Sequence, residues 1–487
     1  MPSILTALSS ATRCAHNATM ESTITLPLWL FILLIAFAAI MVIDRILLPG
    51  MRWYLRRRVN RVIDEVSTRL DIEIRPFQLT RRQNLIDQLV FDDKVIEAVK
   101  QHAAENDMPT AIAQAKAVKY AKEIVPRFNA YIYFRLGYWF AKKVARLVYR
   151  VRVGFYDDEG LKNIPQGSSV VFVMNHRSNM DYILVSFLVA EKTTLSYAVG
   201  EWARIWPLQT LIKSMGAFFV RRNSGNSLYR KVLERYVNMA TRAGVCQAVF
   251  PEGSLTKDGS LREARLGFMD YMLRDYHPDI DKDIVFVPAG INYDRVIEDR
   301  SLLRKLNPDA SKRSIWFIIK TTLGFLHKTL MLSRKNRWRR FGYASVNFGK
   351  PVSAKTYCQQ QQVDFSKLET EQRFASVKNL ADVLMKNISD VVPITPVALM
   401  SEILLSKHED WHSELEIKTR ALARIDKLKE QGAPINISSS ACEQVLAGAL
   451  DILIGRGLVK TENTLLRVSD EGVDVLGYYA NSIRQWK

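Results

Sequence analysis

A histidine and an aspartate five positions apart stand where a predicted strand gives way to a predicted helix. The apolar run 170–174 precedes Asn175 and His176, and Asp181 opens an apolar, helix-like segment. On one regular helix, residues five apart point about 140° away from each other, so the side chains meet only if His176 lies before the helix. Asp181 would then fix the imidazole tautomer and leave the other ring nitrogen as a general base. The alternative is an exposed loop histidine and a helix-capping aspartate.

Three later blocks also carry residues suited to chemistry. Arg221 and Arg222 follow an apolar run, and a guanidinium binds phosphate through two parallel hydrogen bonds. Glu252 and Gly253 end another predicted strand, where the carboxylate is suited to a hydroxyl and glycine permits close backbone approach. Pro288 lies in the fourth block and is expected to shape a wall of the same site. Each block taken alone also fits a surface charge, a plain turn or a strand end.

The order of these blocks resembles the glycerol-3-phosphate/dihydroxyacetone-phosphate acyltransferase family. The four blocks cover residues 175–182, 216–223, 250–254 and 287–294. The likeness is specific over about residues 165–350, and His176-Arg177-Ser178-x-Met180-Asp181-Tyr182 resembles the glycerol-phosphate branch. Residues 394–399 and 478–483 are similar to the C-terminal region of that branch.

The resemblance implies an O-acyltransferase of phospholipid synthesis. It would transfer a fatty acyl group from acyl-CoA or an acidic acyl carrier protein to the sn-1 hydroxyl of glycerol 3-phosphate. Such a transfer needs a base on the hydroxyl and a stabilised oxyanion, and the hydroxyl can attack directly. His176 would be the base and Asp181 would orient it, while Arg221 or Arg222 would bind the phosphate. No bound cofactor and no metal are implied.

One departure from the family pattern leaves the acceptor open. Relatives commonly carry an arginine shortly after the Glu-Gly pair, where this chain has Ser254-Leu255-Thr256-Lys257. We expect Lys257 or Arg265 to supply that charge, with Ser254 among the substrate-binding residues. Glycerol 3-phosphate, dihydroxyacetone phosphate and 1-acylglycerol 3-phosphate (lysophosphatidate) all remain candidate acceptors.

Alternating strands and helices predict an α/β fold for the region that carries the blocks. The predicted strands are 170–174, 195–199, 217–220, 245–250, 284–288 and 344–348, and the predicted helices are 181–190, 202–215, 227–243 and 261–274. This alternation is typical of layered α/β domains. We therefore predict a mixed-sheet acyltransferase sandwich over residues 161–355, flanked by helical N- and C-terminal regions.

The N-terminal part predicts a membrane anchor. A polar segment, 1–22, precedes 18 uncharged, mostly apolar residues, 26–43, which can span a bilayer. The arginines that follow indicate a cytoplasmic C-terminal side, and no small-residue cleavage site follows the run. We expect one transmembrane helix over 23–48, a helical membrane-proximal region over 49–160 and a single-pass protein of the inner (cytoplasmic) membrane, with its catalytic domain in the cytoplasm.

The charge balance indicates an acidic partner. The chain has 69 Lys and Arg against 50 Asp and Glu, a formal charge of +19. The basic stretch 135–153 is either a membrane-surface helix or an ordinary solvated helix face. The basic insert 311–340 favours docking to membrane lipids or an acidic protein. Four scattered cysteines without a Cys-x-x-Cys pair argue against a zinc site or a disulfide framework.

The tail, 356–487, is predicted to be a helical domain. It ends in a helix, a short hairpin and another helix, which also fits a winged-helix pattern. A membrane-tethered nucleic-acid-binding protein is therefore the alternative of another class. That alternative leaves all four blocks unexplained, so we expect no nucleic acid among the partners.

Overall fold

The computed structural model describes residues 76–155, 158–189, 194–200, 208–221, 224–306, 333–435 and 441–487, with residues 27, 28, 35, 331 and 437. The chain divides into two compact units, Met1–Val62 and Ile63–Lys487, and the elements below all belong to the second. Nearly all of the predicted anchor, 23–48, and most of the basic insert, 311–340, lie outside the described residues. Within the described part, no helix has the length and apolarity needed to cross a membrane.

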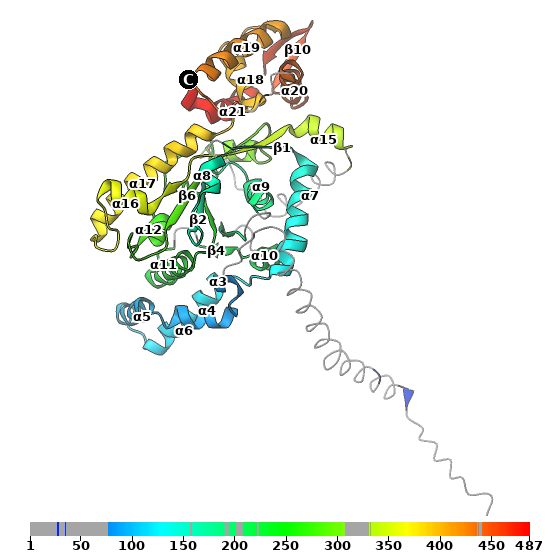
Figure 1. Ribbon diagram of the computed structural model, residues 1–487. Coiled ribbons are helices and arrows are strands. Elements are labelled where there is room, and N and C mark those ends of the chain that lie inside the picture. The colour runs from blue at the N-terminus through cyan, green and yellow to red at the C-terminus, as the bar shows by residue number, and fades with distance from the viewer. Residues whose placement is uncertain are drawn as a thin grey trace, which may run out of the picture. The chain divides into compact units, whose positions relative to one another are not determined.

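A parallel-rich sheet forms the centre of this unit (Figure 1). Its described strands are β1 (Arg150–Phe155), β2 (Ser169–Met174), β3 (Ser196–Gly200), β4 (Phe218–Val220), β5 (Gln247–Val249), β6 (Ile284–Tyr293), β7 (Tyr343–Phe348) and β8 (Val352–Ser353). They lie in the order β1-β7-β6-β2-β5-β3-β4, and β8 pairs with β6. Among the described pairings of this sheet, only those of β6 with β7 and with β8 are antiparallel. The predicted mixed α/β sheet is confirmed.

Three predicted boundaries were wrong. The stretch 135–153 is not one helix, because β1 begins at Arg150 and pairs with β7, its arginines alternating with valines. Strand β6 continues past 288 to Tyr293, because its second half pairs with β7. The helix predicted over 261–274 begins only at Gly267, because the residues before it form a loop around the candidate site.

The sheet is buried on both faces, which explains why its strands read as continuous apolar runs. Helices α7 (Tyr138–Val148) and α9 (Met180–Val189) share one hydrophobic core with it. Helices α11 (Ser227–Arg242), α12 (Gly267–Leu273) and α17 (Thr370–Val391) share the other. Smaller helices connect these layers: α8 (Asp158–Lys162), α10 (Leu208–Ser214), α13 (Asp299–Arg304), α15 (Arg334–Phe341) and α16 (Ala354–Gln361).

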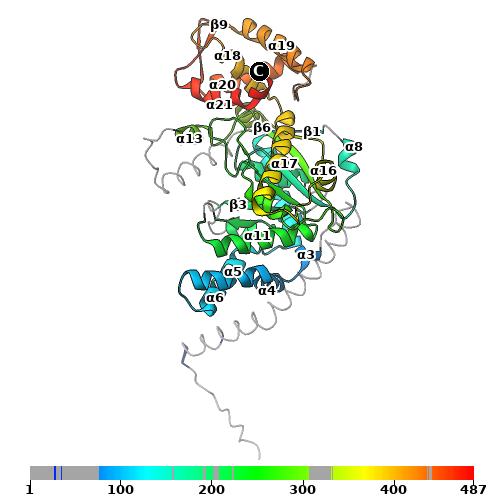
Figure 2. The ribbon, with the colours of Figure 1, turned by 90° about the vertical axis from the view of Figure 1, so that its left-hand side faces the viewer.

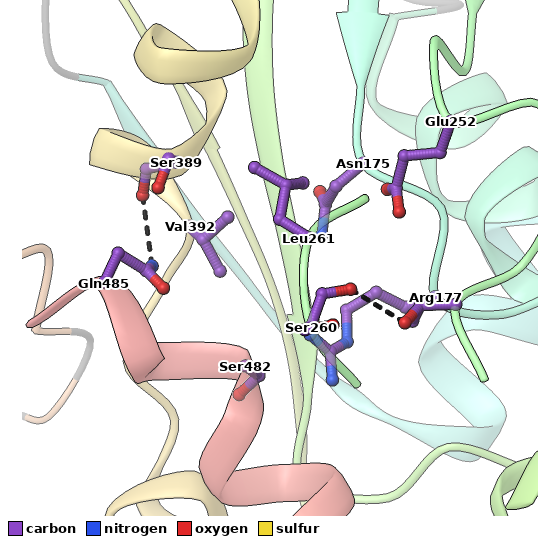
Figure 3. Close-up of a pocket in the computed structure, with 10 residues that line it drawn as sticks. Asn175, Arg177, Glu252, Ser260, Leu261, Ser389, Val392, Ser482 and Gln485 are labelled. Atoms are coloured by element: carbon purple, nitrogen blue, oxygen red, sulfur yellow. Dashed lines mark hydrogen bonds between the residues drawn. The ribbon is translucent and has the colours of Figure 1, made fainter. Parts of the chain in front are cut away.

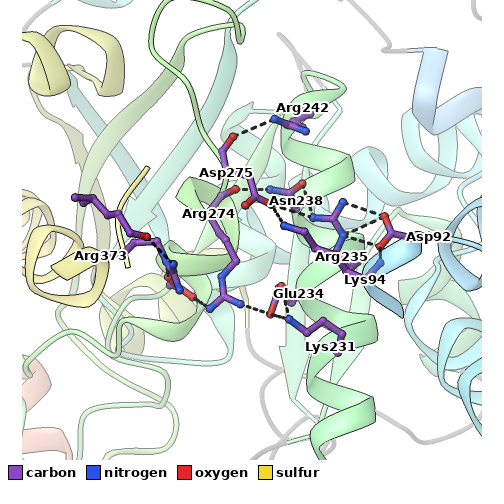
Figure 4. A network of polar contacts seen from close by, with 12 residues as sticks. Asp92, Lys94, Lys231, Glu234, Arg235, Asn238, Arg242, Arg274, Asp275 and Arg373 are labelled. Atoms are coloured by element: carbon purple, nitrogen blue, oxygen red, sulfur yellow. Dashed lines mark hydrogen bonds and ion pairs between the residues drawn. The ribbon is translucent and has the colours of Figure 1, made fainter. Parts of the chain in front are cut away.

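The N-terminal helices pack on α11 (Figure 2). They are α3 (Pro76–Leu79), α4 (Arg82–Val90), α5 (Asp93–Glu105) and α6 (Thr110–Ile124), and a π-helix, Ile132–Gly137, leads into α7. Ion pairs connect these helices to α11 (Figure 4). Arg235 of α11 binds Asp92, at the start of α5, at 2.9 Å, and Arg274 forms an ion pair with Asp270 of α12. Arg373 of α17 binds Asp270 at 2.8 Å. The network thus ties both helical flanks to α11 and α12.

The C-terminal region has the element order expected of a winged helix. Its elements are α18 (Pro396–Leu405), β9 (His412–Ser413), α19 (Glu414–Glu430), α20 (Cys442–Gly455), β10 (Val459–Glu462), β11 (Leu465–Val468), α21 (Gly472–Ala480) and a 3₁₀ helix, Asn481–Trp486. Strands β10 and β11 form an antiparallel hairpin, and β9 pairs with β11. Helices α18 and α21 pack closely together, and α21 also contacts α13.

Candidate active site

The side chains of His176 and Asp181 meet in the geometry that their spacing required. His176 lies in the turn between β2 and α9, and its Nδ1 is 2.9 Å from Oδ2 of Asp181. The same oxygen accepts the backbone N–H groups of Arg177 at 2.8 Å and Ser178 at 3.0 Å. Asp181 is fully buried in the first turn of α9, where the helix dipole favours negative charge. The carboxylate therefore holds both the imidazole and the turn that carries it.

Tyr293 of β6 completes the surroundings of Asp181. Its hydroxyl donates to Oδ1 of Asp181 at 2.7 Å. Burial, together with the adjacent Asp181, raises the pKa of Tyr293 well above its usual range, so the hydroxyl keeps its proton and remains a donor. With Asp181 accepting at Nδ1, the Nε2 atom of His176 is the ring nitrogen left for proton transfer.

Aromatic rings fix the plane of the imidazole. The Phe250 ring is stacked on His176, with centroids 4.0 Å apart and an interplanar angle of 23°. Tyr182 meets His176 edge-on at 5.4 Å. Tyr182 and Phe250 also contact each other, with centroids 5.0 Å apart. The imidazole is thus held on two sides as well as through Nδ1.

Glu252 holds the backbone of the turn that carries His176. Its Oε1 accepts the N–H of His176 at 2.8 Å, and its Oε2 accepts the N–H of Arg262 at 3.1 Å. Burial raises the pKa of Glu252 to about 7, against the lowering effect of these hydrogen bonds. We expected this side chain to bind the acceptor hydroxyl. Instead, both oxygens are engaged by main-chain amides, and Glu252 is not among the described residues that line the main cleft.

A cleft of about 370 Å³ opens beside His176. Its walls combine apolar side chains from β3, β5 and α11 with three arginines and the aromatic rings around the imidazole. The described residues that line it include His176, Tyr182, Val199, Arg221, Arg230, Leu233, Ala248, Phe250, Gly253 and Arg265. A mainly apolar pocket with a few convergent polar groups is the usual form of a small-molecule site.

Arg221 and Arg222 are the two arginines predicted to bind phosphate. Arg221 lines the cleft, but its guanidinium binds Glu123 of α6 with both arms, Nε to Oε1 at 2.9 Å and Nη2 to Oε2 at 2.6 Å. This hydrogen bonding raises the pKa of Arg221 further. Arg222 lies outside the described residues. A phosphate that used the same edge of the Arg221 guanidinium would therefore have to displace a carboxylate.

Gly253 and Arg265 lie against each other at the cleft. Gly253 has a φ of +68°, and an added Cβ would be 2.7 Å from Cδ of Arg265. Only glycine suits both the backbone conformation and the close passage of that side chain. Arg265 is exposed, lines the cleft, and has its backbone N–H bonded to Pro251 at 2.8 Å. Lys257 and Arg265 were the candidate replacements for the arginine that relatives carry after the Glu-Gly pair. Of these two, Arg265 is among the described residues that line the cleft.

The remaining predicted residues lie away from the cleft. The Oγ of Ser254 accepts from Nη1 of Arg262 at 2.5 Å. Lys257 is exposed and is not among the described lining residues. Pro288 is buried in β6, and Gly349 donates its N–H to the Pro288 carbonyl at 2.8 Å. Pro288 is thus part of the sheet and is not among the described residues that line the cleft.

Sequence reasoning missed three residues. Tyr293 stood inside the fourth block, but nothing local linked it to Asp181. Glu298 accepts from Oγ of Ser178 at 2.8 Å and Nδ2 of Asn179 at 3.0 Å. It therefore holds the residues that follow His176 in the turn. Arg230 lines the cleft from the first turn of α11. Its only local signal was its place just after the Asn226 helix cap.

Two family models match this chain. A family model described as Acyltransferase matches residues 156–292, and one described as Glycerol-3-phosphate acyltransferase C-terminal region matches residues 327–486. The first match contains the first three blocks and residues 287–292 of the fourth. The second contains the winged-helix-like elements. The chain belongs to the glycerol-3-phosphate acyltransferase family.

Curated relatives carry the name glycerol-3-phosphate acyltransferase. The protein from Pseudomonas entomophila (strain L48) is 30% identical over 362 residues, 71% of this chain and 41% of the relative. The proteins from Ectopseudomonas mendocina (strain ymp) and Pseudomonas paraeruginosa (strain DSM 24068 / PA7) are 29% and 28% identical, over 71% and 76% of this chain. This member of the glycerol-3-phosphate acyltransferase family spans about 41–43% of the length of these relatives.

A solved structure also matches this family member. The crystal structure of the 1-acyl-sn-glycerophosphate acyltransferase from Thermotoga maritima covers 52% of this chain and 78% of its own. The sequence identity is 17% and the TM-score is 0.29.

Proposed function

We propose that this protein transfers a fatty acyl group from a thioester to the sn-1 hydroxyl of glycerol 3-phosphate. The observation that carries the proposal is the pairing of His176 with Asp181 at the edge of an apolar cleft. Nε2 of His176 would take the hydroxyl proton, and the oxygen would attack the thioester carbonyl. When the tetrahedral intermediate collapses, the carbon–sulfur bond breaks and the leaving thiolate takes the proton from Nε2.

The cleft fits the two reactants. Val199, Leu233 and Ala248 line it with apolar surface suited to an acyl chain. Arg265 and Arg230 line it with positive charge suited to phosphate. We infer that Arg265 binds the acceptor phosphate, since Arg221 is engaged by Glu123. The donor is acyl-CoA or an acidic acyl carrier protein, and the charge of +19 favours either.

Membrane attachment is part of the same proposal. It is supported by the apolar run 26–43 and the arginines that follow it. Protease added from the cytoplasmic side of membrane vesicles should digest the body of the protein. Digestion only from the opposite side would rule out this topology.

An acyl-transfer assay with three acceptors in parallel tests the activity. Membranes carrying the protein would receive a labelled acyl donor with glycerol 3-phosphate, dihydroxyacetone phosphate or lysophosphatidate. The expected product is acylated glycerol 3-phosphate, absent from membranes carrying His176→Ala. A product from only one of the other acceptors would change the acceptor assigned. No product from any of them would overturn the proposal.

The nucleic-acid alternative gains no support from the C-terminal region. Helix α20 occupies the position of the third helix of a winged helix. The segment Cys442–Gly455 contains no Lys or Arg, and its exposed residues include Glu443, Gln444 and Asp451. A helix that enters a groove of DNA usually places lysine or arginine against the phosphates, and this segment offers neither.

A further inference from the structure

The end of the chain is attached to the loops of the candidate active site. Nδ2 of Asn481 donates to the carbonyl of Asp258 at 3.0 Å, and Oγ of Ser482 accepts from Nδ2 of Asn292 at 3.0 Å. Figure 3 shows the C-terminal segment that carries Ser482 facing the part of the site that carries Arg177. These contacts reach the fourth sequence block and the loop that follows the third.

Gly259 and Tyr478 lie against each other through their backbones. Gly259 has a φ of +86°, and a Cβ added there would be 1.8 Å from the carbonyl oxygen of Tyr478. No side chain can be accommodated at that distance, because both partners are main chain. Gly259 therefore allows α21 to sit directly on the loop 256–260.

Tyr478 also contacts the residue next to the proposed base. Its ring centroid is 5.3 Å from Cζ of Arg177, and its hydroxyl donates to the Arg177 carbonyl at 3.3 Å. The Arg177 side chain is 3% exposed, and its Nη1 donates to the Gly259 carbonyl at 3.0 Å. The N–H of Arg177 is one of the groups that donate to Asp181. Tyr478 is thus one residue removed from the pairing of His176 with Asp181.

The loop 256–260 also binds the turn that carries His176. The N–H of Thr256 donates to the His176 carbonyl at 3.0 Å. Oγ1 of Thr256 donates to the Ser260 carbonyl at 2.7 Å and accepts the N–H of Gly259 at 3.1 Å. The turn that carries His176 is therefore held at the Arg177 carbonyl by Tyr478 of α21 and at the His176 carbonyl by Thr256, whose loop packs against Tyr478 through Gly259.

We propose that Tyr478, from the C-terminal region, is a positioning residue for the acyl-transfer step. It acts through Arg177 and the loop 256–260, and does not touch the reacting atoms. The inference rests on the proposed function. It predicts that loosening this contact lowers kcat while substrate binding in the cleft is retained, because the cleft residues belong to other elements.

Two neighbouring tyrosines allow a matched test. Tyr478→Phe keeps the ring over Arg177 and removes only the hydroxyl, so we expect kcat to fall about threefold to tenfold, the scale of one hydrogen bond. The KM values of donor and acceptor should stay within about twofold of wild type. Tyr479→Phe also removes a buried hydroxyl from α21, but one bonded to Val296 and Asp299. It should lower Tm and leave kcat unchanged.

Two glycines with similar backbones give a second, stronger test. Gly259→Ala would force α21 away from the loop. Gly167→Ala imposes the same kind of strain, since Gly167 has a φ of +92°, but has nothing within 4 Å of the added Cβ. We expect Gly259→Ala to lower kcat at least about tenfold beyond the effect of Gly167→Ala, at comparable far-UV circular dichroism.

The outcomes separate this inference from the proposed function. If the wild-type protein is inactive with all three acceptors, the proposed function fails. If it is active and folded Tyr478→Phe has wild-type kcat, only the positioning role of Tyr478 is overturned. A rise in KM at unchanged kcat would also overturn it, because that places the hydroxyl in substrate binding. Should Gly259→Ala fail to fold, Tyr478→Phe decides the question alone.

Discussion

His176 and Glu252 are joined through the main chain of one and the side chain of the other. The N–H of His176 donates to Oε1 of Glu252 at 2.8 Å, while the imidazole itself is held by Asp181. The carboxylate of the third sequence block therefore positions the histidine of the first. This relationship makes Glu252 a group whose ionisation bears on stability as well as on activity.

Glu252 should make stability depend on pH. Burial raises its pKa to about 7 from the ordinary 4.5, so the folded protein binds this proton more tightly than the unfolded chain. The resulting stabilisation is fully present below pH 4.5 and is lost as pH rises through about 7, on the order of 3 kcal/mol in total. Glu252→Gln cannot titrate. Relative to Glu252→Gln, the wild-type free energy of unfolding should therefore fall between pH 5 and pH 8.

Denaturant unfolding at pH 5, 6.5 and 8 checks this expectation. Glu263→Gln serves as the control, because Glu263 is an exposed residue of the same loop. A wild-type advantage that grew with pH would mean that Glu252 is ionised more easily in the folded protein, contrary to the effect of its burial.

His176→Ala should abolish most of the catalytic rate without unfolding the protein. A general base contributes at least about a hundredfold, so kcat should fall by that factor or more. His277→Ala is the control, since His277 lies near Asp364 and outside the described lining of the cleft. Steady-state kinetics and thermal melts measure the two effects. Near-normal kcat in well-folded His176→Ala would remove this imidazole from the mechanism.

Tyr293→Phe should weaken catalysis through Asp181. Losing the hydroxyl removes the donor to Oδ1, and we expect kcat to fall about threefold to tenfold. Tyr149 is a matched control: its ring is 5.2 Å from that of Tyr293, and its hydroxyl donates to the Arg295 carbonyl at 2.7 Å. Tyr149→Phe should leave kcat unchanged. Equal losses in both variants would point to packing and not to the Asp181 contact.

Arg265→Lys tests the phosphate site. Lysine keeps the charge but loses the planar fork, so the acceptor KM should rise about tenfold while the donor KM changes little. Lys257→Ala should leave both KM values at wild type, because Lys257 lies outside the described lining of the cleft. Arg221→Lys should lower Tm, because Arg221 binds Glu123. It should raise the acceptor KM less than Arg265→Lys does. An acceptor KM that responded to Arg221 and not to Arg265 would reverse these assignments.

The sequence alone was enough to determine features set by local chain geometry. The pairing of His176 with Asp181 depends on one turn between a strand and a helix, and the residue spacing restricts how that turn can fold. The central strands were predictable because they are buried on both faces and read as apolar runs. Strand β1 was missed because its alternating arginines and valines follow an amphipathic helix without a break.

Only the tertiary structure decided which distant groups meet. Glu252 binds the backbone of a residue 76 positions away, and Arg221 binds a carboxylate 98 positions away. Tyr478 reaches Arg177 across 301 positions. Periodicity and residue type report whether a side chain is buried or charged, but a hydrogen bond depends on where two backbones lie in space. The sequence could therefore indicate the proposed base and the proposed acyl-transfer chemistry. The groups that position this base emerged only from the packing of the sheet, the helical flank and the C-terminal region.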